Sequence, residues 1–582
     1  MAQHTLTQAL PSTQKSRKRQ GIGAGSVILI LFLAYCYFIP RGALWNPDTR
    51  IFLTASIVDR GKLNIDPYAQ YTGDKAAYNG HYYSDKAPGS SLLAVPAYFL
   101  VKFALYQGKT NYLSLLSTSD EQRTDFLARY LITLLLVGLP SALLGGLLFR
   151  FLGYLGLGLR GRLVLTLGYG LGTIAFAFST VFFSHQMAAL LLFATFYLLF
   201  RIKQGVLAER HYLTAGLLAG YAVITEYPTA LIVCCLAIYV LSHVRRLRPM
   251  LLLGVGTLPS LALVALYNTL CFGSPLNQGY ANLAGPETFR VGQSQGLLGI
   301  TAPHLDALWQ TTFGPYRGLF LLSPFLLLAF PGFVLLFRQR AWRSEAWLWL
   351  SIVIVYFLFV ISYYAWDGGY SLGPRHFIPA LPFLILPIAP VLQQQKWVRS
   401  VASLLIGYSI VIVTLATAVF PLNDPRFDAP LTQRVLPMLL GIQPNPEHPA
   451  IPGATLWSAF WREAPLFTHA QLDNNWGELF SLPGIWQLLP LVVGIALVLT
   501  RFWWSTRPKL PAGASTPESA LVTAAATPLS QLAADHLTEP PLLSASADGW
   551  QATDQPDPFE SAAERVDPSS SPHSAHPGSP GT

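Results

Sequence analysis

Charged residues are scarce in this sequence. Only 12% of its 582 residues are Asp, Glu, Lys or Arg, whereas 52% are hydrophobic, and a soluble globular chain carries about 25% charged residues. This deficit excludes an ordinary soluble enzyme. The hydrophobic residues gather in long runs, and a membrane core roughly 30 Å thick needs about 20 helical residues to cross it. We therefore expect an all-α polytopic membrane protein.

Cysteine is also rare. The four cysteines, Cys36, Cys234, Cys235 and Cys271, all lie inside apolar runs, which excludes a disulfide framework in an exposed domain. No Cys/His pair has the spacing of a zinc finger. The sequence also shows no internal repeat.

The apolar runs predict about twelve transmembrane helices. Run 212–242 is broken at Glu226, Tyr227 and Pro228, so we expect it to form a hairpin of two short helices. The other runs each supply one helix: 21–40, 126–149, 163–183, 187–200, 250–272, 318–337, 346–364, 377–392, 401–420 and 485–500.

Basic clusters orient these helices. Because short cytoplasmic loops carry an excess of Lys and Arg, the cluster at residues 15–19 and those of the later short loops predict cytoplasmic termini. Four polar segments then lie outside: 41–125, 273–317, 365–376 and 421–484. Run 92–105, with Pro96 and Lys102 inside it, is expected to lie on or dip into the outer leaflet.

Three parts follow from this organisation. Residues 1–20 are expected to be a cytoplasmic tail, and 21–505 a transmembrane domain whose large first outer loop contains juxtamembrane helices. Residues 506–582 are rich in Pro, Ser and Ala, with nine acidic residues and a single basic one, Arg565, from 510 onward. Such a composition predicts a disordered cytoplasmic tail.

Asp48 is the first candidate catalytic residue. It follows the first span in Asn46-Pro47-Asp48, where its carboxylate can face a lipid-linked substrate at the membrane surface. A helix N-terminus also favours Asn, Pro and Asp in this order. A structural role at the helix start is therefore the alternative.

The segment from His81 to Pro88 contains the second candidate group. Asp85 and Lys86 stand side by side before an expected helix start, and a lysine there suits a phosphate. His81 is a supporting candidate. The alternative is a lysine that reaches the interface, or a solvated ion pair.

Five further residues lie at outer helix ends. His185, Glu226 and Asp367 are ionisable groups at membrane depth, which are usually functional or paired. Arg317 and Arg375 lie outside against the positive-inside trend, and guanidinium groups bind phosphate bidentately. Anchoring in an aromatic belt is the alternative for Arg375.

These residues resemble those of the integral-membrane C-type (GT-C) glycosyltransferases, which include protein O-mannosyltransferases and the aminoarabinose transferases of lipid A. Asp85-Lys86-Ala87-Pro88 is similar to the acid-Lys-Pro-Pro motif of their first outer loop, and Thr225-Glu226-Tyr227-Pro228 resembles their Thr-Lys-Gly-Pro segment. The segment Gly373-Pro374-Arg375 resembles segments in sequences of a bacterial branch of the superfamily.

The resemblance implies a GT-C-like bundle and sugar transfer from a polyprenyl-phosphate donor to an acceptor hydroxyl on the outer side. Lys86, Arg375 and Arg317 would bind the donor phosphate, and Asp48 or Asp85 would be the base. A divalent metal near Asp85, His185 and Glu226 is compatible with the sequence, which establishes none. We expect a glycan, lipid or protein as the acceptor. The retained first span and the basic inner loops predict a bacterial inner membrane, with the outer face towards the periplasm or exterior. A carrier or flippase for a lipid-linked saccharide and a non-catalytic scaffold are the alternatives.

Overall fold

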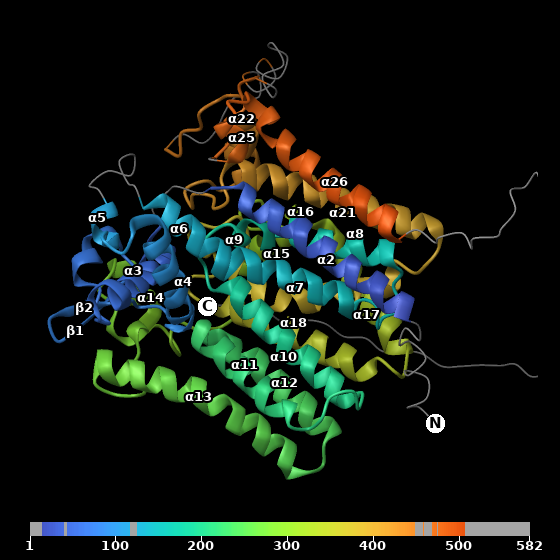
Figure 1. The fold of residues 1–582 in the computed structure, drawn as a ribbon, viewed down its shortest axis with the longest axis horizontal. Helices are drawn as coiled ribbons and strands as arrows, with labels where there is room; N and C mark the ends of the chain where they lie inside the picture. The colour runs from blue at the N-terminus through green and yellow to red at the C-terminus, as the bar shows by residue number, and fades with distance from the viewer. Residues whose placement is uncertain are drawn as a thin grey trace, which may run out of the picture. The chain divides into compact units, whose positions relative to one another are not determined.

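The computed structural model describes residues 14–39, 44–116, 125–447, 468–473 and 475–506, together with Thr455 and Ser458. This part of the chain is mainly helical (Figure 1). Its one sheet pairs two short strands, β1 (Ala76–Tyr78) and β2 (His81–Tyr83). The expected 506–582 tail lies outside the described residues except for Thr506, and the 1–20 tail does so up to residue 13.

Helices of eight or more residues form most of the fold. In chain order they are α2 (Gln14–Tyr37), α3 (Trp45–Arg60), α4 (Gly89–Tyr106), α6 (Phe126–Thr133), α7 (Leu139–Phe151), α8 (Leu159–Leu171), α10 (His185–Lys203), α11 (His211–Thr225), α12 (Ala230–His243), α13 (Leu247–Phe272), α14 (Glu287–Ser294), α15 (Leu305–Thr312), α17 (Ala329–Arg338), α18 (Arg343–Ser362), α21 (Lys396–Val419) and α26 (Leu489–Thr506).

Shorter helical turns connect them. The short α-helices are α5 (Tyr112–Leu115), α9 (Ala175–Ser179), α16 (Leu319–Leu322), α19 (Leu381–Ile385), α20 (Ile388–Val391), α22 (Leu436–Leu439) and α25 (Trp476–Leu479). Turns of 3₁₀ or π geometry are Asp66–Tyr71, Leu134–Gly138, Tyr227–Thr229, Gly279–Asn282, Pro324–Leu328, Arg375–Ala380, Leu431–Val435 and Gly484–Leu488.

The chain is a polytopic helical membrane protein. Seven helical segments of the described part are long and apolar enough to cross a membrane: Gly89–Tyr106, Phe126–Phe151, His185–Lys203, Leu247–Phe272, Arg343–Ser362, Lys396–Val419 and Gly484–Thr506. Three shorter apolar helices, Gly21–Tyr37, Tyr227–His243 and Pro324–Arg338, add to them. The expected all-α class is confirmed, whereas the number of about twelve spans is not.

Helix breaks occur where the sequence places polar residues inside apolar runs. The run 212–242 is interrupted at Glu226, whose φ of −153° is extended, so α11 and α12 are separate helices as predicted. His185 begins α10. Because broken helices leave backbone groups free at membrane depth, such ends are tolerated where protein or a water-filled cavity surrounds them.

Helix α4 covers the run 92–105. The sequence places this run at the outer leaflet, and the helix meets the length and hydropathy of a crossing segment. It packs against α3, α6 and α11, and in Figure 1 it lies in the blue group of elements beside α3. Its position relative to the bilayer therefore stays a prediction.

Helix α2 organises one side of the bundle. It packs against α7, α8 and α26, and its pairing with α26 is antiparallel, because a Cβ on Gly23 would approach Phe502 while the Tyr37 hydroxyl donates to the Gln487 carbonyl. The end of α2 at Tyr37 therefore lies beside Gln487, just before the start of α26. Both Gln14 and Thr506 lie at the opposite end from Tyr37.

Close helix contacts depend on small residues. A Cβ added to Gly216 of α11 would lie 2.1 Å from the Leu253 carbonyl oxygen of α13, and 2.9 Å from Gly256. Glycines let helix backbones approach closely where lipid supplies no hydrophobic driving force. This contact fixes α11, and with it Glu226 at its end, against α13.

The hairpin of β1 and β2 positions part of the site. Asn79 and Gly80 both have positive φ, 48° and 79°, as a two-residue type I′ turn requires. The register pairs Ala76 with Tyr83, so Asp74 and Asp85, which flank the strands, come to the same end of the hairpin.

Candidate functional site

A cluster of charged and aromatic side chains lies where the first loop meets the helix ends. Its basic members are Arg50, Lys86 and Arg375, and its acidic members are Asp74, Asp85 and Glu226. Two histidines and three tyrosines complete it: His185, His376, Tyr280, Tyr363 and Tyr364. We call these residues the interface cluster.

Lys86 is at the centre of the interface cluster. Its Nζ lies 2.8 Å from Asp85 Oδ2 and 3.1 Å from Asp74 Oδ2, and its side chain is only 10% exposed. The hairpin explains this arrangement, because it brings both carboxylates to the residue that follows β2. Tyr280 lies under the ammonium group at 5.5 Å. The two carboxylates raise the pKa of Lys86 despite its burial, so it carries a full positive charge.

Close backbone packing places Tyr280 there. A Cβ on Gly279 would lie 2.7 Å from the Cα of Asp85, and Ala284 N donates to the Lys75 carbonyl. Segment 279–285 therefore lies directly on the hairpin. Burial raises the pKa of Tyr280 to about 12, against the opposing effect of Lys86, so its hydroxyl keeps its proton and can donate a hydrogen bond.

Asp85 has the properties of a base that works near neutral pH. It is buried, and one of its carboxylate oxygens, Oδ1, has no hydrogen-bond partner in the described part of the chain. Burial above all raises the pKa of Asp85 to about 6; the Asp74 charge adds to this effect and Lys86 opposes it. A group with a pKa near the working pH is suited to proton transfer.

Arg50 and Glu226 connect α3 with the break between α11 and α12. The Arg50 guanidinium lies 3.8 Å from Glu226 Oε2 and donates to Ser90 Oγ at 2.9 Å. The Ser184 hydroxyl donates to the same Glu226 oxygen, and His185 Nδ1 is 3.5 Å from it. The cation that a buried carboxylate needs is therefore Arg50.

Arg375 offers an available guanidinium. It follows Pro374 at the start of turn Arg375–Ala380, and its carbon Cζ lies 5.0 Å from the Phe183 ring centre. Within the described residues it makes no hydrogen bond or ion pair, and its Nε is buried without a partner. The charges that act on it include Asp74, Asp367 and Glu226, so it faces the interface cluster.

Arg317 has a different environment. Its side chain is fully buried, and it donates to three backbone carbonyls, those of Asp367 at 3.0 Å, Gly369 at 2.6 Å and Tyr316 at 3.3 Å. Asp367 in turn accepts from Gly369 N at 3.1 Å. Arg317 and Asp367 thus fix the loop that precedes Arg375.

Asp48 lies in a neighbouring network. Its carboxylate is 3.1 Å from Arg129, which also pairs with Asp125 at 2.8 Å, and Tyr112 donates to Asp125 at 2.5 Å. All four side chains are buried. This network joins α3 to α5 and α6. His81 is separate again, half exposed near the hairpin turn, with Asp66 at 2.7 Å.

Of the residues that the sequence singles out, the structure therefore brings together Asp85, Lys86, His185, Glu226 and Arg375. It adds Arg50, Asp74, Tyr280, Tyr363, Tyr364 and His376. The charge argument that selects Arg317 and Arg375 also applies to Arg50, which lies in the same outer segment as Lys86. Asp74 and Tyr280 have no comparable signal, because only the hairpin and its packing bring them to Lys86.

No metal site is evident in the described part of the chain. It contains no group of three or more His, Cys, Asp and Glu side chains that could hold an ion. His185 and Glu226 approach each other, but Asp85 is held by Lys86 instead. The arrangement can bind an anion between cations and move a proton on a carboxylate.

Asp48→Asn tests whether the buried network is structural. We expect the free energy of unfolding to fall by about 1–3 kcal/mol, since a charged partner of Arg129 is lost while Asp125 remains. The melting temperature of the purified protein and its turnover check this. A loss of turnover as large as that of an Asp85 variant, at unchanged melting temperature, would instead make Asp48 the base.

No family model matches the chain, and no curated protein matches it in sequence. Among solved structures, ArnT from Cupriavidus metallidurans bound to undecaprenyl phosphate is similar at 15% identity, with a TM-score of 0.42 over 83% of this chain and 75% of that one. Its apo structure gives 15% identity and a TM-score of 0.43 over 83% and 74%. Both measures are low, so the function proposed below rests on this chain's own residues.

Proposed function

We propose that this protein is a membrane glycosyltransferase that moves a sugar from a polyprenyl-phosphate donor to an acceptor hydroxyl. The observation that supports this most is the meeting of Lys86, Arg375 and Arg50 with Asp85 at the ends of apolar helices. A polyprenyl phosphate has the matching chemistry, because its anionic head lies at the interface while its isoprenoid tail stays in lipid. ArnT is described with one such lipid, undecaprenyl phosphate; for this chain, the resemblance of Asp85-Lys86-Ala87-Pro88 and the interface cluster suggest that class of donor.

Lys86 and Arg375 hold the phosphate in this proposal. A planar guanidinium gives two parallel hydrogen bonds to phosphate, and an ammonium gives a point charge. Arg375 makes no competing ion pair among the described side chains, and Lys86 exchanges part of its contact with Asp74 for the ligand. Arg317 positions the loop of Arg375, and Asp367 supports it.

Asp85 is the base in this proposal. The acceptor hydroxyl gives its proton to Asp85, its oxygen forms a bond to the anomeric carbon, and the bond from that carbon to the phosphate oxygen breaks with its electron pair. The products are the glycoside, the polyprenyl phosphate and a protonated Asp85. Cations around the phosphate stabilise the charge that builds on the leaving oxygen, which is usually the largest contribution to such catalysis.

The bound donor phosphate also makes Asp85 a stronger base. An anion next to a carboxylate favours its protonated form, so the donor phosphate raises the proton affinity of Asp85. Glu226, His185 and His81 take supporting roles. Glu226 holds Arg50 at the edge of the cluster, His185 lies against Glu226, and His81 holds the hairpin through Asp66.

The site faces the periplasm of a bacterial inner membrane in this proposal. The basic cluster at residues 15–19 begins α2, and Asp48 and Arg50 follow its other end. An impermeant thiol reagent tests the orientation through a Lys109→Cys variant in a cysteine-free background, since Lys109 is exposed in the first loop. Labelling in intact spheroplasts supports the assignment, and labelling only after lysis contradicts it.

The purified chain in liposomes with a polyprenyl-phosphate sugar mixture tests the activity. The enzyme should release polyprenyl phosphate when a hydroxylated acceptor is present. A carrier, the alternative from the sequence, would move the intact donor across the bilayer and leave its sugar bond unbroken. Movement without bond cleavage would therefore reject the transferase.

Arg375→Lys and Arg375→Gln separate charge from geometry. Because lysine keeps the charge but loses the bidentate fork, we expect turnover to fall about tenfold with lysine and about 100-fold with glutamine. Steady-state rates with the lipid donor measure this. Arg338→Gln, which removes an exposed arginine elsewhere, should leave turnover unchanged. An Arg375→Lys variant that turns over at the parent rate would remove the fork from the mechanism.

A further inference from the structure

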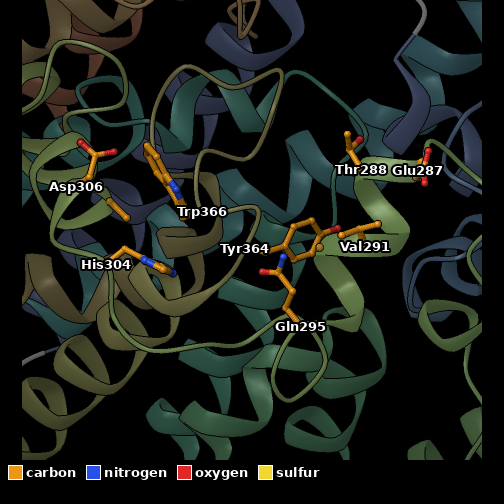
Figure 2. A pocket seen from close by; sticks show the side chains of 10 residues that line it. Glu287, Thr288, Val291, Gln295, His304, Asp306, Tyr364 and Trp366 are labelled. Atoms are coloured by element: carbon orange, nitrogen blue, oxygen red, sulfur yellow. The ribbon is translucent and has the colours of Figure 1, made fainter.

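A cavity lies beside the interface cluster. It has a volume of about 640 Å³ and is bounded by α14, the start of α15 and segment 364–366. Figure 2 shows Tyr364 between two groups of side chains, with Glu287, Thr288, Val291 and Gln295 on one side and His304, Asp306 and Trp366 on the other. Ligand sites of proteins have about 300–1,000 Å³, so the cavity can hold a small molecule.

Tyr364 connects this cavity to the interface cluster. Its ring lines the cavity, and the charges of Lys86, Asp74 and Asp85 act on its hydroxyl. Gly292 and Gly299 let the ring lie close, because an added Cβ would come within 2.1 Å and 2.6 Å of it. Tyr364 N also donates to the Gly299 carbonyl at 2.9 Å. The Tyr364 ring therefore borders both the cavity and the site of Lys86.

The lining selects by charge. Glu287 and Asp306 are exposed, and neither has an ion-pair partner among the described residues, whereas no Lys or Arg lines the cavity. Two carboxylates with no basic residue in the lining repel a phosphorylated or carboxylated molecule and attract an amine within about 8 Å, the screening length at physiological salt. The cavity therefore favours cationic ligands, whereas the neighbouring phosphate site favours anionic ones.

The other lining groups are suited to hydroxylated rings. Trp366 and Tyr364 offer flat apolar faces against which the C–H face of a sugar ring can pack, and Gln295, His304 and Thr288 offer hydrogen-bond donors and acceptors. A purely apolar ligand would leave these polar groups unpaired.

We infer that this cavity binds the acceptor, and that the acceptor is a neutral or aminated saccharide rather than a phosphorylated one. This inference rests on the proposed function, since the bound hydroxyl must reach Asp85 past Tyr364, form the bond to the anomeric carbon and give up its proton there. The bond from that carbon to the donor phosphate breaks, and the polyprenyl phosphate leaves with the electron pair.

A glycan array that carries neutral, amino and phosphorylated saccharides tests the inference without donor lipid. The full chain, labelled and held in nanodiscs, should bind neutral and amino saccharides, and phosphorylated ones at least about tenfold more weakly. Trp366→Ala should weaken saccharide binding about tenfold. Asp306→Asn, an exposed and structurally mild change, should weaken the amino saccharides more than the neutral ones.

Matched variants complete the test. Trp397→Ala and Glu478→Gln change an exposed tryptophan and an exposed acid outside the cavity, and should leave binding as in the parent chain. Lys86→Met should keep saccharide binding but lose transfer, which separates this inference from the proposed function. No saccharide binding, a preference for phosphorylated glycans, or binding indifferent to both Trp366→Ala and Asp306→Asn overturns the inference.

Discussion

Replacement of Lys86 by methionine is expected to reduce sugar transfer by about 100- to 1,000-fold, the usual effect of removing one electrostatic contact to developing charge. Methionine keeps most of the volume of the side chain and removes the ammonium group. The donor phosphate then loses the charge that lies between Asp74 and Asp85, and it meets two carboxylates without their cation. Binding of polyprenyl phosphate should weaken as well as turnover. Initial rates and lipid binding in liposomes measure the two effects.

Folding must be separated from function in this variant. Removing one partner of a buried ion pair leaves charge unpaired, which costs about 3–5 kcal/mol. The double variant Lys86→Met/Asp74→Asn removes one of the two stranded carboxylates, and should regain stability without regaining transfer. Lys109→Ala removes an exposed lysine of the same loop and should behave as the parent. A Lys86→Met enzyme that is folded and transfers sugar at the parent rate would refute the phosphate role.

The sequence indicates the helix ends better than the contacts between them. Glu226 and His185 interrupt apolar runs, and the structure breaks or begins a helix at both, because an ionisable residue is costly in the middle of a span. The general class of a helical membrane protein follows from the same runs. The number of spans does not, since proline-rich runs such as 377–392 form several short turns rather than one helix.

The composition of the candidate site depends on tertiary contacts that local patterns do not contain. Asp85 and Lys86 are adjacent in the chain, so their pairing is visible in the sequence. Asp74 joins them only through the register of the hairpin, and Tyr280 only through the close approach of Gly279 to Asp85. Asp48 and Lys86 share the segment predicted to be the first outer loop, yet α3 directs Asp48 towards Arg129. The position of a residue in the sequence does not show which way its side chain points from a helix.

The same limit applies to Arg317 and Arg375. Both lie in Gly-Pro segments that the sequence predicts to be on the outer side, so the sequence makes them equivalent phosphate candidates. Among the residues that the structure describes, Arg317 has three backbone carbonyl partners and Arg375 has none. A guanidinium that is already satisfied holds a loop, whereas an unsatisfied one can take a ligand.

Asp85→Asn should lower transfer by about 10²- to 10⁴-fold, because a positioned general base contributes that much. Asparagine keeps the shape of the side chain and cannot accept the proton. Lipid binding should change much less than turnover, since the amide leaves Lys86 free to meet the phosphate. Glu478→Gln, at an exposed site outside the cluster, serves as the control. A variant that loses lipid binding and turnover together would give Asp85 a role in holding Lys86 instead.

The pH profile tests the same assignment independently. Burial, and secondarily the Asp74 charge, raise the pKa of Asp85 to about 6. A base acts in its ionised form, so transfer should be low below pH 6 and rise as the pH passes through that value. Asp74→Asn removes one cause that raises the pKa, and it should move this acid limb to lower pH, with residual activity at pH 5 above that of the parent relative to each maximum. Asp85→Asn should abolish the limb. A limb that stays in place in both variants belongs to another group, and Asp85 would then not be the base.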